Sequence, residues 1–286
     1  MKRIILLALL AAVVAGCGAD KAAKKTGWDE DGLKGKVKSI RLAAYEAVEK
    51  FGELTKNGIA DGDDNNTLKK YDDKGNIIEE NCYNSDGSLG SKFTYKYDDK
   101  GNRIEGNCYN SDSSLLVEFT YRYDAKGNKI EENVYYSDGS LIYKYTYKYD
   151  DKGNQIEENE YKSDGSLLYK YTYKYDAKGN KIEANLYNSY GSLDFTVTYK
   201  YDAKGNRIEM NAYNSNGSLK SKSTYKYDDR GNRIETNDYN SDGSLDRKET
   251  LKYKYDNKNN WIERIEYRGE ANIATEIAER TIEYYE

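Results

Sequence analysis

The chain has 286 residues, a formal net charge of −5 and 32 tyrosines, but it has no proline and no histidine. No basic stripe exists to meet phosphates, so the charge pattern argues against a nucleic-acid partner. Because tyrosine strongly favours strands, the composition predicts an all-β protein and argues against a disordered polar chain, despite a mean hydropathy of −1.03.

Residues 1–16 are predicted to be the signal peptide of a lipoprotein. Lys2 and Arg3 provide a basic start, and the apolar run over residues 4–14 is too short to cross a bilayer as a helix. The tetrapeptide Val-Ala-Gly-Cys over residues 14–17 resembles the lipobox of bacterial lipoproteins. The resemblance implies cleavage before Cys17 and a thioether-linked lipid on its sulfur.

Lipidation predicts a lipid-anchored protein of the cell envelope. Cleavage also removes Lys2 and Arg3, which takes the formal charge from −5 to −7, so we expect membrane attachment through the lipid on Cys17 and not through a polybasic patch. Gly18, instead of Asp, directly after Cys17 favours the outer membrane of a Gram-negative bacterium.

Two segments are expected before the repeats. Residues 17–35 are small and charged, which indicates a flexible, lipid-anchored tether. Residues 36–66 are predicted to form an N-terminal cap, with half a repeat over 37–45 and a loose acidic loop over 57–66. Asp61, Asp63 and Asp64 in that loop lack the spacing of a calcium-binding loop, so no metal site is predicted.

Residues 67–258 repeat a unit of 26 residues. In each copy a Gly is followed by Asn and, two residues after that Asn, by Ile. The seven glycines are Gly75, Gly101, Gly127, Gly153, Gly179, Gly205 and Gly231. A fixed period of this length indicates a repeat architecture, in which each unit buries its apolar side against its neighbours.

Each unit carries two turn signals, which predict a hairpin at both ends of every strand. Asp176 precedes Gly179 by three residues, and Asn188 precedes Gly191 by the same spacing. Asp or Asn at the first position and Gly at the fourth indicate a type I turn, with Gly at positive φ. The prediction is a repetitive antiparallel β-meander of hairpins, with no helix between the strands.

Strand parity predicts which side chains share a face. Counting back from the turn at Gly179 pairs the residues as Tyr175 with Lys181, Tyr173 with Glu183, Tyr171 with Asn185, and Tyr169 with Tyr187. One face would then collect Tyr, Leu, Phe, Glu and Asn, and the other Lys, Thr, Asp and Ile. The first face varies less between copies, so we expect it to be the inner one.

The second face would carry a variable position of the repeat. Two residues after each Ile the chain has Glu80, Gly106, Glu132, Glu158, Ala184, Met210 and Thr236. About sixteen strands should curl into a spiral, a tube or a broad barrel-like wall. The alternative is a single-layer twisted sheet, wet on both faces and held by tyrosine and charge ladders.

Residues 259–286 are predicted to be an altered repeat and a C-terminal cap strand. Trp261 replaces the usual basic residue there, and residues 275–285 are expected to form a last edge strand, charged enough to discourage edge pairing. Cys82 and Cys108 lie one period apart, about 9–10 Å if each repeat contributes two neighbouring strands. A disulfide needs a closer approach, so two free thiols are expected.

The Tyr-Asp-x-x-Gly-Asn core resembles the YD repeat of Rhs-like proteins. Residues 97–102 and 149–154 carry it, and the resemblance covers residues 67–263. In that family the repeats form long, spiralling β-sheet shells; some enclose a toxin, and carbohydrate binding has been proposed for others. This unit is longer, with a second Asn-Ser-Asp-Gly-Ser turn, and the chain is more similar to small YD-repeat lipoproteins of Gram-negative envelopes.

No enzyme or cofactor is predicted. The commonest general base, histidine, is absent, no Ser or Cys lies in a nucleophile elbow, and the paired carboxylates recur in every copy. Tyrosine is the feature with binding potential, because aromatic rings can stack on sugars and a repeat array multiplies weak contacts. The candidate stacking residues are Tyr143, Tyr145, Tyr169 and Tyr171. The plainer interpretation is that these tyrosines only form the core.

Two functions therefore stand as hypotheses. The first is a lipid-anchored, non-catalytic binding or adhesion module with a glycan or an envelope protein as its partner. The second is a structural scaffold or a shell fragment of an Rhs/toxin-related system.

Overall fold

The computed structural model describes residues 25–60, 62 and 65–286, and within them the chain is almost entirely β. The short helix α2 spans Gly27–Glu30. The strands are β1 (Val37–Lys50), β2 (Glu53–Ile59), β3 (Asn66–Tyr71), β4 (Ile77–Tyr83), β5 (Leu89–Tyr97), β6 (Arg103–Asn110), β7 (Leu115–Tyr123), β8 (Lys129–Tyr136), β9 (Leu141–Tyr149), β10 (Gln155–Lys162), β11 (Leu167–Tyr175), β12 (Lys181–Asn188), β13 (Leu193–Tyr201), β14 (Arg207–Asn214), β15 (Leu219–Tyr227), β16 (Arg233–Asn240), β17 (Leu245–Tyr255), β18 (Trp261–Arg268) and β19 (Ile273–Tyr284).

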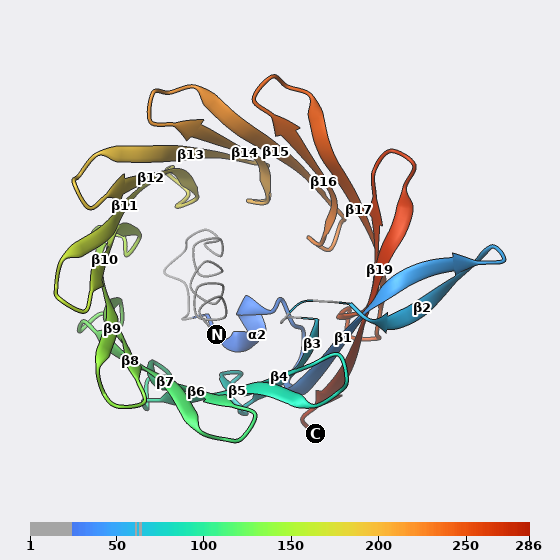
Figure 1. Cartoon of the computed structure of the whole chain (residues 1–286), viewed down its shortest axis with the longest axis horizontal. Helices are drawn as coiled ribbons and strands as arrows, with labels where there is room; N and C mark the ends of the chain where they lie inside the picture. Colours follow the sequence, from blue (N-terminus) through green and yellow to red (C-terminus); the bar gives the residue numbers. More distant parts are fainter. Residues whose placement is uncertain (1–24, 61, 63–64) are drawn as a thin grey trace.

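The strands form one antiparallel meander that closes on itself. From β3 to β19 each strand pairs with the next, and β1 pairs with both β3 and β19, which makes a ring of eighteen strands. β2 lies outside the ring and extends the far half of β1 as a protruding hairpin (Figure 1). The predicted repetitive β-meander is confirmed, and its curled sheet is a closed barrel.

The prediction of a C-terminal edge strand is wrong. β19 pairs with β18 on one side and with β1 on the other, from Val37 opposite Tyr284 to Glu46 opposite Glu276. Within the closing pair Ala44 and Ala278 lie opposite each other and are only 1% and 0% exposed. Closure of the ring leaves β19 without an unpaired edge. The residue pattern and charge of a single strand cannot predict this closure.

The N-terminal cap also differs from the expected half repeat and loose loop. β1 is a full strand of fourteen residues, and β2 covers residues 53–59, so it takes in the first three residues of the expected loop. A tight turn at Phe51 and Gly52, both at positive φ, joins them. Asp61, Asp63 and Asp64 lie outside the described residues.

Hydrogen bonds within the turns explain the repeated Asp-x-x-Gly-Asn motif. Asp176 Oδ1 accepts from the backbone N–H groups of Lys178 and Asn180, both at 2.9 Å. Asn180 Nδ2 donates to Asp176 Oδ2 at 2.8 Å, and Gly179 takes a φ of +83°. The Asp therefore accepts the backbone hydrogen bonds of the turn, and the Asn side chain holds the Asp in place. The Gly adopts the positive φ that residues with a Cβ disfavour.

The tyrosine before each of these turns ties one repeat to the previous one. Its hydroxyl donates to the backbone carbonyl of a residue twenty positions earlier in the chain. The pairs are Tyr97–Ile77, Tyr123–Arg103, Tyr149–Lys129, Tyr175–Gln155, Tyr201–Lys181 and Tyr227–Arg207. Tyrosine and turn together show that the YD core of the repeat has a structural role.

The predicted face assignment is wrong because each hairpin contains a bulge. Tyr175 pairs with Lys181 as predicted, but the next pairs are Lys174 with Glu183 and Tyr173 with Ala184. The extra residue is Ile182, which shifts the register by one and moves every later side chain of β12 to the other face. The constant Glu and Asn of the repeat consequently share a face with Lys and Thr.

That constant face is the outside of the barrel and carries a ladder of ion pairs. In one example, Glu157 of β10 accepts from Lys148 of β9 at 2.6 Å and from Lys170 of β11 at 2.7 Å, and Asn159 donates to the same carboxylate. Equivalent pairs recur along the wall, as in Lys96–Glu105, Lys174–Glu183, Lys200–Glu209 and Lys226–Glu235. The lysines are mostly exposed, so each pair contributes little alone.

The tyrosine face is the inner one, as predicted. Figure 1 shows α2 inside the ring, where Asp31 accepts hydrogen bonds from Tyr71 at 2.6 Å and Lys69 at 2.9 Å. Lys69 and Tyr71 of β3 occupy the positions that Tyr95 and Tyr97 hold in the next repeat. Tyr97, Tyr121 and Tyr123 also line a pocket beside α2.

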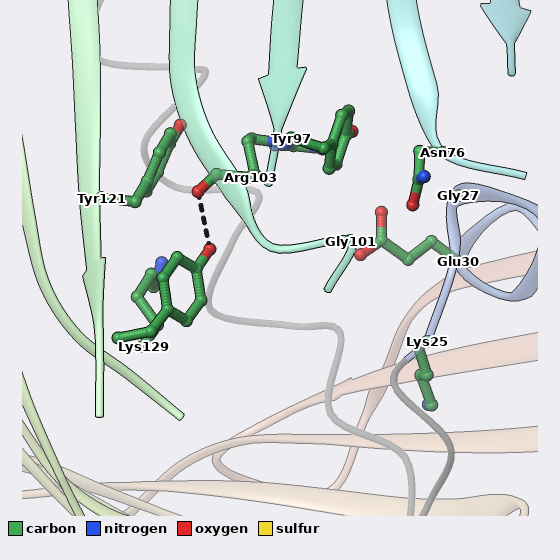
Figure 2. A pocket seen from close by; sticks show the side chains of 10 residues that line it. Lys25, Gly27, Glu30, Asn76, Tyr97, Gly101, Arg103, Tyr121 and Lys129 are labelled. Atoms are coloured by element: carbon green, nitrogen blue, oxygen red, sulfur yellow. Dashed lines mark hydrogen bonds between the residues drawn. The ribbon is translucent and has the colours of Figure 1, made fainter. Parts of the chain in front are cut away.

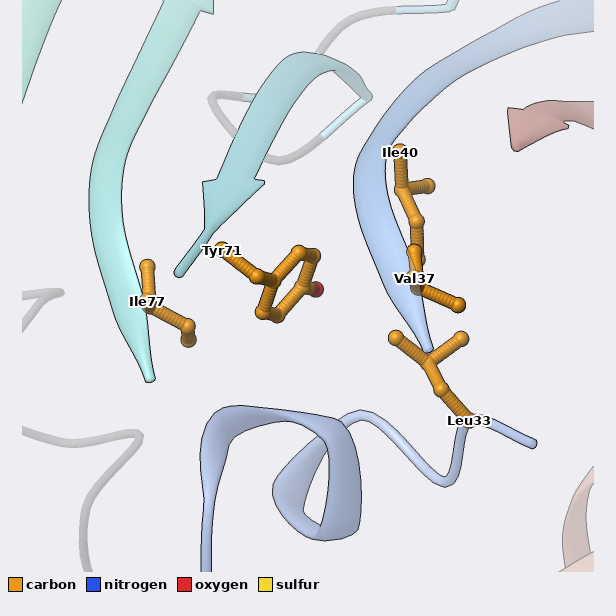
Figure 3. Close-up of a cluster of buried hydrophobic side chains, with 5 residues drawn as sticks. All are labelled: Leu33, Val37, Ile40, Tyr71 and Ile77. Carbon is orange, nitrogen blue, oxygen red and sulfur yellow. The ribbon is translucent and has the colours of Figure 1, made fainter. Parts of the chain in front are cut away.

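The second half of the segment expected to be a tether is docked on the inner wall. Trp28 donates its indole N–H to the Val37 carbonyl at 2.7 Å. Leu33 is buried in a cluster with Val37, Ile40, Tyr71 and Ile77 (Figure 3). A Cβ on Gly27 would approach Cγ1 of Ile77 to 2.4 Å, so only glycine fits there. Burial of these apolar side chains against the barrel holds the segment in place. The charged composition of the segment did not predict this docking.

Candidate binding site on the luminal wall

The bulge places this variable position of the repeat, two residues after the Ile, inside the barrel. Glu132 pairs with Tyr121 and Tyr145, and Glu158 pairs with Tyr147 and Tyr171, all on the luminal face. In later copies the equivalent residues are Ala184, Met210 and Thr236. Sequence reasoning assigned this position to the outer face and so missed these luminal carboxylates; the signal available was variability within an otherwise constant repeat.

A second luminal carboxylate, Glu160, lies two residues further along β10. Glu160 pairs with Tyr145 of β9 and Tyr169 of β11, and Glu158 is next to it on the same face. The equivalent positions in neighbouring repeats are Val134 and Leu186. The chain therefore concentrates two inward carboxylates in β10, between two tyrosine-rich strands.

Burial and tyrosine contacts set the electrostatics of these carboxylates. Glu158 Oε2 accepts from the Tyr173 hydroxyl at 3.1 Å and from Gln155 Nε2 at 3.0 Å, but burial raises the pKa of Glu158 above its usual value. Burial likewise raises the pKa of Glu160, which accepts a hydrogen bond from Tyr145. The surroundings of both carboxylates thus disfavour their ionised form and supply neutral hydrogen-bond donors.

The structure brings the four predicted tyrosines together on this wall. Tyr143 and Tyr145 come from β9 and Tyr169 and Tyr171 from β11, on either side of Glu160. The ring centroids of Tyr143 and Tyr145 are 6.4 Å apart, and the rings are tilted by 49°. Burial, with Glu160 and Glu158 nearby, raises the pKa of Tyr171 to about 12, so its hydroxyl stays protonated and can donate.

Tyr145 differs from the other three because it belongs to the core. It is 6% exposed and packs in a buried cluster with Cys108, Val117 and Val134. Tyr143, Tyr169 and Tyr171 are only partly buried, and Tyr143 also packs against the edge of this cluster. The interpretation as core residues therefore holds for Tyr145, and ligand stacking by the other three tyrosines stays a prediction.

A separate pocket of about 240 Å³ lies between α2 and strands β4 to β8 (Figure 2). Glu30 of α2 and the barrel residues Arg103, Tyr121 and Lys129 line it. The Tyr123 hydroxyl donates to the Arg103 carbonyl at 2.9 Å at its edge. Lys129 is paired with Glu132 at 2.6 Å, so part of the positive charge is already neutralised.

Cys82 and Cys108 are free thiols, as expected, and burial raises the pKa of Cys108 to about 11. Cys17 lies outside the described residues. In the part of the chain that is described, no helix is long and apolar enough to cross a membrane.

Comparison with known proteins supports the anchor. Residues 1–17 match the prokaryotic membrane lipoprotein lipid attachment site. This match indicates a membrane-anchored envelope protein that is attached through lipid. None of the curated proteins compared with the sequence matches it.

Solved structures with similar folds are distant in sequence. The TcdB2–TccC3 crystal structure is 14% identical with a TM-score of 0.37, and the match covers 79% of this chain but only 15% of that one. A porin-like protein from Bacteroides uniformis is 13% identical with a TM-score of 0.42, over 86% of this chain and 96% of that one. A porin-like protein from Bacteroides vulgatus is 14% identical with a TM-score of 0.39, over 87% and 98%.

Proposed function

We propose that this chain is a lipid-anchored protein of the Gram-negative outer membrane that binds a glycan, without catalysis, on the luminal wall of its barrel. The observation that carries the proposal is the wall formed by β9, β10 and β11. There the half-buried rings of Tyr143, Tyr169 and Tyr171 lie beside the inward carboxylates of Glu158 and Glu160.

This combination suits a sugar ring. A tyrosine ring offers a flat apolar face together with a hydroxyl that can hydrogen-bond. Carboxylates accept hydrogen bonds from hydroxyl groups at up to four lone-pair sites. The mouths and interiors of β-barrels are also common places for ligand sites. The outer wall also carries tyrosines such as Tyr161, but its carboxylates are occupied by lysines, as at Glu157. The donors to Glu158 are neutral, which favours the lumen as the binding surface.

The arrangement of Glu158 and Glu160 favours binding over hydrolysis. Glycosidases place two carboxyl groups on opposite sides of the scissile bond, with a gap for the sugar between them. Here both carboxylates project from one strand, two residues apart, in the same direction. They can accept hydrogen bonds from one side of a ligand, but they do not lie on opposite sides of a glycosidic bond.

A second candidate function is a structural scaffold or shell, related to Rhs-type shells. It is supported by the continuous ring of strands around α2. A gene product that co-purifies with the native protein in a fixed ratio, with no glycan bound, would favour this function over glycan binding.

The test uses the mature lipoprotein in detergent and a panel of envelope and capsule oligosaccharides. The variant Tyr169→Ala/Tyr171→Ala removes two luminal rings, and Tyr161→Ala is the matched control because Tyr161 of β10 lies on the outer face. We expect at least one glycan to bind, with about tenfold or greater loss in the luminal variant and no change in the control. Equal losses in both variants, or no bound glycan in the panel, would contradict the proposal.

A further inference from the structure

In one repeat the basic residue that begins the strand after the Asp-x-x-Gly-Asn turn has a luminal carboxylate partner three positions along the chain. Lys129 pairs with Glu132 at 2.6 Å, and Gln155, the neutral counterpart in the next repeat, donates to Glu158. The bulge makes this spacing possible, because it brings residues i and i+3 to the same face.

Four other repeats begin with a cation that has no carboxylate three residues later. In two of them the cation has another polar side-chain partner, because Arg103 donates to the Tyr97 hydroxyl and Arg233 pairs with Glu249.

Lys181 and Arg207 are the other two cations. Lys181 of β12 is followed three residues later by Ala184, and Arg207 of β14 by Met210. Among the described residues neither Lys181 nor Arg207 forms an ion pair. This part of the luminal wall therefore carries two positive charges with no carboxylate on the same strands to neutralise them.

Both cations are held against tyrosine rings instead of in open solvent. Lys181 Nζ is 3.9 Å from the ring centroid of Tyr173. The Arg207 guanidinium carbon is 5.6 Å from the ring centroid of Tyr199 and 5.2 Å from that of Tyr225. Nε of Arg207 is buried and has no hydrogen-bond partner. A buried donor without a partner costs free energy, which a bound acceptor would recover.

The two charges also affect each other. Burial lowers the pKa of Lys181, Glu158 opposes that change, and the positive charge of Arg207 adds to it. β13 lies between β12 and β14, so the two backbone positions are about two strand spacings apart, roughly 9–10 Å. Tyr199 of β13 lies between them, opposite Met210. Two long side chains can converge on one small oxyanion across this gap, above the Tyr199 ring.

We propose that Lys181, Arg207 and Tyr199 form an oxyanion site, and that the glycan bound by the luminal wall is acidic. The inference rests on the proposed glycan-binding function for its ligand class. The acidic group of the sugar accepts charge-assisted hydrogen bonds from Lys181 Nζ and from the Arg207 guanidinium. The neutral hydroxyls of the same ligand reach the adjoining β9–β11 wall, because β11 pairs directly with β12.

The first experiment tests the anion site without a glycan. The midpoint of thermal unfolding is measured for the mature lipoprotein in sodium sulfate and in sodium chloride at equal ionic strength. Arg207→Gln and Lys181→Gln remove the two cations one at a time. Lys204→Gln is the control, since Lys204 is an exposed turn residue of the same repeat. Sulfate should raise the midpoint of the wild-type and control proteins more than that of either luminal variant.

An equal gain in all four proteins would be the general salt effect of sulfate and would overturn the anion site. If one luminal variant does not fold, the other gives the same comparison, because each retains one cation. A smaller gain in the luminal variant that folds, with the control unchanged, supports the site.

The second experiment tests the acidic ligand with a matched pair of probes, oligogalacturonate and its methyl ester. The two share ring shape and hydroxyls, and they differ in charge. We expect the acid to bind about tenfold more tightly than the ester, and the advantage to disappear in Arg207→Gln. Equal binding of acid and ester would overturn the acidic class. A sulfate effect with no sugar bound by any variant would leave the anion site standing and contradict the proposed glycan function.

Discussion

Glu157 and Glu158 are neighbours in β10, yet they lie on opposite sides of the barrel wall and have opposite electrostatics. Burial acts to raise the pKa of Glu157, but hydrogen bonds from Lys148, Lys170 and Asn159 outweigh it and hold that pKa at about 2. Burial dominates at Glu158 and raises its pKa. The outer residue belongs to a repeated ladder, and the luminal residue has equivalents as different as Gly106 and Met210.

The difference separates residues that build the wall from residues that vary between copies. Residues that recur in every copy, such as the turn Asp and Asn and the outer Lys and Glu, have partners that build the wall. Residues that change from copy to copy face the lumen, where they set its local charge and shape. A closed barrel allows this division, because the backbone ladder between strands can stay the same when a luminal side chain changes.

The largest expected effect is a loss of stability when a side chain of the luminal core is shortened, compared with the same change at an exposed bulge residue. Val134→Ala removes two methyl groups from a side chain that is 0% exposed, in the cluster with Cys108 and Tyr145. We expect the free energy of unfolding to fall by about 2 kcal/mol, measured by urea denaturation. Ile156→Ala, at the bulge of β10, is the comparison and should cost about 1 kcal/mol or less. Equal losses would contradict a core on the luminal side.

A smaller effect, of opposite sign for the two residues, is expected in the pH dependence of stability. The folded pKa of Glu157 lies below its unfolded value, so its contribution is present above pH 4.5 and is lost as the pH falls toward 2. The folded pKa of Glu158 lies above its unfolded value, so its ionisation destabilises the fold as the pH rises above 4.5.

The two glutamine variants should therefore diverge. Glu157→Gln should lose stability relative to the wild type at neutral pH and approach it in acid. Glu158→Gln should match the wild type in acid and gain on it as the pH rises. Urea midpoints at several pH values between 3 and 8 give the comparison. Parallel curves for the two variants would show that the residues share an environment.

Much of the fold could be predicted from the sequence, because the turn signals and the 26-residue period are local features. The positions of Gly179 and Gly191 fix the hairpins, and hairpins without intervening helices give a meander. The bulge at Ile182 could not be predicted by counting residues, and one extra residue reversed the faces of β12. Ring closure also could not be predicted from the alternation of side chains within a strand, because it depends on the pairing of β1 with β19 at opposite ends of the chain.

The candidate site was predicted only in part. The excess of aromatic residues in two adjacent repeats singled out Tyr143, Tyr145, Tyr169 and Tyr171, which lie on one wall; that they stack on a ligand stays a prediction. Their partners Glu158 and Glu160 were missed, because the wrong register put Glu158 outside. The sequence also did not show which tyrosine belongs to the core, because Tyr145 is buried by Val117 and Val134 from other strands.

Closure of the ring is the most direct test of an account in which a luminal face differs from an outer face. The variant Ala44→Cys/Ala278→Cys places one thiol on β1 and one on β19, directly opposite each other. Under mild oxidation we predict a single intramolecular disulfide, detected by peptide mass spectrometry, while Cys82 and Cys108 stay reduced in both the variant and the wild type. Absence of the 44–278 link, or its formation only between molecules, would contradict the closed barrel.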